Sequence, residues 1–211
     1  MRWWLVPIAL AGCFGSTQTP FDEGVAPLEE MAVDAPEDLA ERFNLRVEEG
    51  DEHIWGHLRG YIHADLNTVW DAFKDDEVAV NRRRVASWTA ELDVEPEYDF
   101  SMAIDQVVED TITIEYTIVW RHGAAGGTAQ DPQKVSMRWQ KTDGTSLIDK
   151  LAGSVALLPT DDPNITEVQM VEHLKAPLTG TEDVEGLLVD VFNDALLHAK
   201  GEPLPDLSDE D

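Results

Sequence analysis

The chain has a single cysteine, Cys13, among its 211 residues. One cysteine can form neither an intramolecular disulfide nor a cysteine-based metal cluster. Basic residues are also scarce, because Lys and Arg number 15 against 43 Asp and Glu, and the formal net charge is −28. Without a basic patch to displace counterions from phosphates, the chain is not expected to bind nucleic acid. The same balance argues against electrostatic docking on anionic lipid.

Motifs for catalysis or metal binding are missing as well. The sequence has no Gly-x-Ser-x-Gly or other nucleophile motif. His53 and His57 share parity on one expected strand, where residues four apart are separated by ~13 Å. Zinc–nitrogen bonds of ~2.1 Å cannot bridge that distance, so we expect no metal site and no cofactor.

Two further stretches have a simpler interpretation than a binding motif. The glycine-rich residues 123–127 lack a following Lys-Ser/Thr and do not open a helix, which favours a flexible hairpin loop over a phosphate cradle. Residues 82–84 are three consecutive arginines, the only basic cluster. We expect surface ion pairs from them, with a site for an anionic headgroup as the alternative.

Long apolar runs are absent too, and the run near the N-terminus, from Trp3 to Leu10, is short. Eight residues cannot span a hydrocarbon core of ~30 Å, which needs ~20 residues in a helix. A basic Arg2, a short apolar stretch and small residues after it are typical of an export signal. The alternative is a buried N-terminal segment with an incidental free cysteine.

The four residues Leu10-Ala11-Gly12-Cys13 resemble a bacterial lipobox, a signal that is cleaved before its cysteine, whose thiol is then diacylated. The resemblance implies a lipoprotein signal peptide over residues 1–12, lipidation of Cys13, and a membrane as partner through the acylated cysteine. Phe14 stands where an Asp commonly signals inner-membrane retention in enteric bacteria. We therefore expect an outer-membrane lipid anchor, with the domain facing the periplasm or the cell surface.

Composition divides the rest of the chain into three parts. Residues 13–49 mix Gly, Ser, Thr, Pro and acids without sustained periodicity, which predicts an acidic flexible tether. Within it, Leu39 and Phe43 are four residues apart and suggest a short helix over 35–44. Residues 50–203 are the expected domain, and residues 204–211 form an acidic tail.

The domain begins with a strand-like segment at 53–62 and a short helix that Asn67 or Thr68 can cap. Apolar and polar residues then alternate with period two, which predicts strands with one apolar face. The six segments are 85–94, 100–108, 112–120, 135–140, 147–158 and 165–174. Apolar residues at helical spacing from Val184 to Ala199 predict a long final helix, which Gly201 ends.

Seven antiparallel strands and one long amphipathic helix can bury their apolar faces if the sheet curls around the helix, an α+β fold. This order, with Val69-Trp70 in residues 64–75 after the first strand, resembles the START-like (SRPBCC, polyketide cyclase/dehydrase-like) superfamily, whose architecture is the helix-grip fold. Asp65 stands where that superfamily often has a proline before the short helix. The superfamily has no universal catalytic motif.

The resemblance implies a cavity between helix and sheet that binds or carries a hydrophobic small molecule or lipid. Side chains on the expected inner face would line it: Met102, Ile104, Ile114, Tyr116, Ile118, Trp120, Met137, Trp139, Val168, Met170, Glu172, Leu188 and Phe192. The same residues could instead fill a solid core. An inward Glu172 would orient a polar group of the ligand, unless a bulge turns it to solvent.

Two other function classes stay open. One is a cyclase/dehydratase-type enzyme that uses Tyr116 or Glu172 for acid–base chemistry. The other is an interaction lipoprotein whose core is simply filled. A non-catalytic binder is favoured over the enzyme because no convergent acid–base pair stands out in the sequence.

Overall fold

The computed structural model describes residues 15–109, 112–177 and 179–206 of the chain. Its main element is one antiparallel sheet of eight strands in the order β1-β2-β8-β7-β6-β5-β4-β3. The elements along the chain are η1 (Glu37–Leu39), β1 (Phe43–Glu49), β2 (Ile54–Ile62), α1 (Leu66–Ala72), α2 (Asp76–Ala79), β3 (Ser87–Leu92), β4 (Phe100–Glu109), β5 (Thr113–Thr128), β6 (Asp131–Gly144), β7 (Lys150–Pro159), β8 (Thr166–Lys175) and α3 (Thr181–Ala199).

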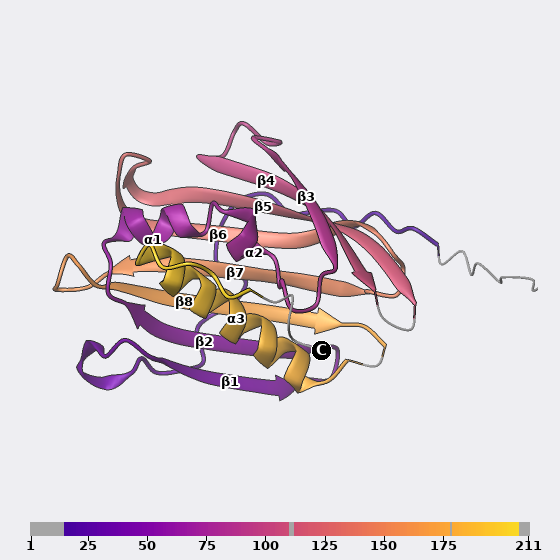
Figure 1. The fold of residues 1–211 in the computed structure, drawn as a ribbon, viewed down its shortest axis with the longest axis horizontal. Coiled ribbons are helices and arrows are strands. Elements are labelled where there is room, and N and C mark those ends of the chain that lie inside the picture. Colours follow the sequence, from indigo (N-terminus) through magenta and orange to yellow (C-terminus); the bar gives the residue numbers. More distant parts are fainter. Residues whose placement is uncertain (1–14, 110–111, 178, 207–211) are drawn as a thin grey trace, which may run out of the picture.

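All three α-helices lie on one face of the sheet, and α3 crosses it over β1, β2 and β8 (Figure 1). The core lies between this helical layer and the inner face of the sheet. The predicted α+β class, with an antiparallel sheet and a long C-terminal helix, is confirmed. The short helix is also present, although its N-cap is Asp65, whose Oδ1 accepts hydrogen bonds from the backbone N–H groups of Asn67 and Thr68 at 3.1 Å each.

The helix α3 approaches β2 closely because β2 has a glycine beneath it. A Cβ atom on Gly56 would lie 2.5 Å from Val184 Cγ1 and 2.7 Å from Leu188 Cδ1. On β7, a Cβ on Gly153 would lie 2.4 Å from the Trp139 indole. These two glycines therefore let α3 and an indole ring sit directly on the sheet, on either side of β8.

The sheet has one strand more than the seven predicted. The added strand is β1, which pairs antiparallel with β2 along its whole length. Residues 43–49 were expected to belong to a flexible tether, but they form β1. A short helix was expected over residues 35–44, where the structure has only the 3-10 helix η1 before the strand. Residues 43–47 form a strand because apolar and polar side chains alternate along them. Phe43, Leu45 and Val47 face the core, and the residues between them are exposed.

One other prediction about local structure is corrected. The glycine-rich residues 123–127 lie inside β5 and not in a hairpin loop, and register shifts occur around Gly126. These β-bulges let the glycine-rich residues remain hydrogen-bonded to β6. The tail expected at 204–211 begins with an ordered contact, because Pro205 O accepts a hydrogen bond from Arg82 Nη1 at 3.2 Å; residues 207–211 lie outside the described part.

Residues 15–34, which we call the N-terminal strap, run across the outer face of the sheet, opposite α3 (Figure 1). The strap starts at the turn between β6 and β7. Ser146 N donates to Gly15 O at 2.8 Å, and Thr17 N donates to Gly144 O at 2.9 Å. The predicted flexible tether is therefore wrong for this stretch, because the outer face offers polar groups that hydrogen-bond its backbone.

Farther along, the strap crosses β5, β6 and β7. Arg121 Nη1 donates to Asp22 O at 2.6 Å, and its guanidinium lies 3.8 Å from the centroid of the Phe21 ring. Ser154 Oγ accepts a hydrogen bond from Leu28 N at 2.9 Å. Arg121 and Ser154 are consequently buried although they lie on the outer face.

The strap reaches β8 and β2 through one carboxylate. Glu29 Oε1 lies 2.6 Å from His57 Nε2 and 3.0 Å from His173 Nε2. His57 Nδ1 also accepts a hydrogen bond from Ala32 N at 2.9 Å, which leaves its Nε2–H to donate to Glu29. Burial acts to raise the pKa of Glu29, but the hydrogen bonds from His173 and His57 outweigh it and the pKa is lowered.

Candidate functional site

A cavity of about 460 Å³ lies between α3 and the inner face of the sheet. Its lining is mostly apolar and comes from β4, β5, β6, β7, β8 and α3. The indoles of Trp120 and Trp139 stack with ring centroids 5.7 Å apart on neighbouring strands and form part of its wall. The volume is within the range of small-molecule binding sites, ~300–1,000 Å³.

The cavity opens at one end of the sheet. Residues of three connections line this end: Val108 and Ile112 from the β4–β5 hairpin, Leu147 and Ile148 from the β6–β7 turn, and Pro177 after β8. These connections lie together at the right-hand end of the molecule in Figure 1. Ile112 is 44% exposed, so the rim itself presents apolar surface.

The buried part of the lining includes a carboxyl group, Glu172 on β8. In the sheet, Glu172 lies between Gly56 and Gly153, and the side chains that pass over these glycines shield it from solvent. Glu172 is 1% exposed, and its Oε2 has no hydrogen-bond partner among the described residues. Burial, together with the negative charge of Asp183, raises the pKa of Glu172 well above its ordinary value.

A phenol on β5 shares the cavity with this carboxyl. Burial raises the pKa of Tyr116 above its ordinary value, and the charge of Glu172 adds to the shift. Gln106, which faces Tyr116 in the β4–β5 register, also lines the cavity and is 3% exposed.

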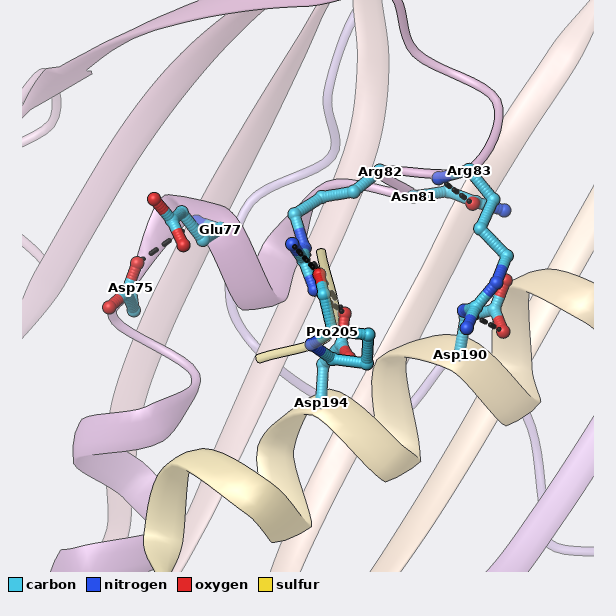
Figure 2. Close-up of polar contacts among 8 residues, drawn as sticks. All are labelled: Asp75, Glu77, Asn81, Arg82, Arg83, Asp190, Asp194 and Pro205. Atoms are coloured by element: carbon cyan, nitrogen blue, oxygen red, sulfur yellow. Dashed lines mark hydrogen bonds and ion pairs between the residues drawn. The ribbon is translucent and has the colours of Figure 1, made fainter. Parts of the chain in front are cut away.

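The three consecutive arginines join the loop after α2 to α3. Figure 2 shows two of them, Arg82 and Arg83, with their partners on α3. Arg82 Nη2 lies 3.2 Å from Asp194 Oδ2, and both side chains are largely buried. Arg83 Nη1 lies 2.6 Å from Asp190 Oδ1.

Arg84 makes the third pair, in which its Nη2 lies 2.9 Å from Asp183 Oδ1. This pair is at the rim of the cavity, since both residues line it. The loop is thereby fixed over α3 by ion pairs. Surface ion pairs were expected for all three arginines, but the pair of Arg82 is largely buried.

The structure divides the thirteen side chains predicted to line a cavity into two groups. Eight line it: Ile114, Tyr116, Ile118, Trp120, Trp139, Met170, Glu172 and Leu188. The other five, Met102, Ile104, Met137, Val168 and Phe192, are buried in the core outside it. Phe192, for example, packs edge-on against Phe43, with ring centroids 5.2 Å apart.

Sequence reasoning missed Gln106 and the loop after α2. Gln106 has the same parity as Met102 and Ile104, so the alternation of this strand would have been enough to place it on the inner face. Asn81 carries no comparable signal, because α2 is a single turn and the loop after it has no period. Val85 was expected to begin a strand, but β3 starts at Ser87 and Val85 lies in the loop. Among the described residues, no group of three or more His, Cys, Asp or Glu is arranged to hold a metal ion.

No family model matches the sequence, and no curated protein matches it. Solved structures do resemble the fold. The human StarD13 (DLC2) lipid transfer and protein localization domain has a TM-score of 0.52 at 7% identity, over 74% of this chain and 83% of that one.

The Zhui aromatase/cyclase from Streptomyces sp. R1128 has a TM-score of 0.49 at 10% identity, over 74% of this chain and 94% of that one. Ara h 8.0201 has a TM-score of 0.46 at 10% identity, over 76% of this chain and all 100% of the other. The likeness is one of fold, and the fold is START-like: a helix-grip sheet with a long C-terminal helix.

Proposed function

We propose that this chain binds a hydrophobic small molecule or lipid in the cavity between α3 and the sheet. The observation that carries the proposal is the cavity itself, about 460 Å³ and lined mostly by apolar side chains. Burial of apolar ligand surface contributes ~25 cal/mol per Å², which amounts to several kcal/mol for a few hundred Å² before association costs. The StarD13 domain, whose name describes lipid transfer, has the same fold.

Native mass spectrometry with solvent extraction tests this proposal on protein that starts at Phe14 and so keeps the whole strap. We expect a co-purifying apolar molecule, or saturable binding of an uncharged fluorescent dye. Trp139→Leu enlarges the cavity without adding charge and should change the affinity or the set of molecules retained. Trp55→Leu is the matched control, because Trp55 lies outside the cavity beside His57 and Arg46.

Protein that is always empty and binds no apolar dye at any concentration would contradict ligand binding. A change of the same size in Trp55→Leu and Trp139→Leu would show that the cavity is not the site.

We also propose that Cys13 is acylated and anchors the chain to the outer membrane, with the domain facing the periplasm or the cell surface. Support comes from the residues Leu10-Ala11-Gly12-Cys13 and from Phe14 after them, all outside the described part of the structure. Within residues 15–109, 112–177 and 179–206, no helix is long and apolar enough to span a bilayer. An acyl anchor would therefore supply membrane attachment that these helices do not.

Metabolic labelling with a radioactive fatty acid, followed by membrane fractionation, tests the anchor. The native chain should carry label and sediment with outer membranes, whereas Cys13→Ala should lose both properties. Continued processing and membrane attachment of Cys13→Ala would contradict the proposal.

A further inference from the structure

Three buried polar groups that line the same cavity have no hydrogen-bond partner among the described residues. They are Glu172 Oε2, Gln106 Nε2 and Trp120 Nε1. Each side chain is at most 3% exposed. A buried polar group without a hydrogen-bond partner lowers the stability of the folded state. In native proteins most such groups bond to protein, water or ligand.

These groups surround one space from two sides of the curled sheet. Gln106 and Trp120 come from the neighbouring strands β4 and β5, together with Tyr116, whereas Glu172 comes from β8. All four side chains line the same cavity of about 460 Å³. A single ligand can therefore meet groups from both sides.

The chemistry of the four groups favours an uncharged oxygen. The amide of Gln106 and the indole of Trp120 donate hydrogen bonds, and Tyr116 can donate or accept. A carboxyl buried without a cation stays protonated and also donates. Among the described residues that line the cavity, Arg84 is the one cation, and it pairs with Asp183 at the rim.

A ligand carboxylate would find no positive charge at this depth. Its desolvation would go uncompensated. The net charge of −28 on the chain would further disfavour the entry of an anion. The cavity should consequently separate neutral from anionic amphiphiles.

We propose that Glu172, Gln106 and Trp120, with Tyr116, form a hydrogen-bonding subsite for a hydroxyl or carbonyl oxygen of an otherwise apolar ligand, and that the cavity rejects carboxylates. This inference rests on the proposed binding of hydrophobic ligands. It narrows the ligand class to neutral, oxygen-bearing apolar molecules such as long-chain alcohols, ketones or esters.

The test is displacement of an uncharged naphthylamine dye by an alkane, an alcohol, a methyl ketone and a carboxylic acid of equal chain length. It is run at about pH 8, where the acid is ionised. One added hydrogen bond should make the alcohol and ketone bind roughly three- to tenfold more tightly than the alkane. The acid should bind at least about tenfold more weakly than the alcohol, since its charge stays unpaired.

Substitution of the buried carboxyl tests the subsite directly. Glu172→Gln keeps a neutral polar group and should keep the preference for the alcohol over the alkane. Glu172→Leu should abolish most of that preference while leaving dye binding intact. Glu115→Gln makes the same replacement of Glu by Gln at an exposed position of β5 and should match the native chain.

The outcomes separate the two proposals. Failure of every compound and of the dye to bind would overturn the proposed function. Binding of the dye with equal affinity for acid and alcohol, or an unchanged preference in Glu172→Leu, would overturn the subsite alone. Near-ultraviolet circular dichroism confirms that each variant is folded, and Glu172→Leu is expected to melt no lower than the native chain, because it removes an unpaired buried group.

Discussion

His122 is a titratable side chain held inside the core, 0% exposed. Its Nδ1 accepts a hydrogen bond from Trp70 Nε1 at 3.2 Å, which joins α1 to β5. The Phe100 ring lies beside it, with centroids 4.9 Å apart. Burial, helped by the positive charge of Lys74, lowers the pKa of His122 from 6.5 to about 3. The folded chain therefore holds this imidazole neutral over the whole physiological range.

The depressed pKa predicts acid sensitivity. The unfolded chain binds a proton below pH 6.5 and the folded one does not until about pH 3, so stability is full above 6.5 and is lost as pH falls between these values. By this linkage His122 should remove about 2 kcal/mol of folding free energy between pH 7 and pH 5. Urea denaturation at the two pH values measures the loss. His122→Phe should be less stable at pH 7 but lose visibly less on acidification; equal losses would contradict the assignment.

At the scale of the elements, two glycines inside regular secondary structure, one in a strand and one in a helix, differ in the atoms that surround them. Gly153 on β7 lies under the Trp139 indole, with no room for a side chain, whereas a Cβ on Gly186 in α3 would meet nothing within 4 Å. One glycine is required by a close contact. The other only adds flexibility to a helix.

Alanine at these positions should act in opposite directions. Gly153→Ala forces the indole away from the sheet and should cost roughly 1–3 kcal/mol of unfolding free energy. Gly186→Ala should gain about 0.5–1 kcal/mol, because alanine restricts the unfolded chain and favours the helix. Chemical denaturation of both variants checks the signs; a stabilised Gly153→Ala would refute the contact.

The elements also show what the sequence could and could not predict. Alternation identified the inner faces of β5 and β8, and helical spacing identified α3. Parity gives the face of a strand but not the position along it that the helices cover. For that reason Met102 and Trp120, paired in register, share a face although only Trp120 reaches the cavity.

Strand β1 and the N-terminal strap were missed for a related reason. Their backbone groups are satisfied by partners far away in sequence, such as β2 for the strand and Ser154 for Leu28. Local composition, rich in acids, Gly and Pro, therefore suggested a flexible linker. Such long-range pairing leaves little trace in a window of neighbouring residues.

At the scale of the whole molecule, the strap joins strands from both halves of the sheet. It contacts Arg121 on β5 near one end and His57 on β2 near the other. Five strands are thereby bridged by one extended segment. It also covers polar side chains that would otherwise form the outer surface.

Removal of the strap should loosen the sheet without unfolding it. A chain that starts at Ala35 keeps β1 and all of the core, but it loses the hydrogen bonds to Arg121, Ser154 and His57. At about 0.5–1.5 kcal/mol for each bond, the loss should be roughly 2–4 kcal/mol. Thermal denaturation measures this loss. A melting temperature unchanged by the deletion would mean that the strap contributes no stability.

The place where the strap begins has a consequence for orientation. Gly15 is fixed to Ser146 in the same turn that supplies Leu147 and Ile148 to the rim of the cavity. Cys13 precedes Gly15 by two residues, a reach of at most about 7 Å. Under the proposed acylation, the opening would be held against the bilayer, with the β7–β8 turn pointing away. A spin label at Ile112 should then sense acyl chains, and one at Asp162 should sense water alone. The anchor would be attached beside the opening of the cavity and would keep that opening at the membrane surface. A ligand could then pass between bilayer and cavity without crossing open solvent.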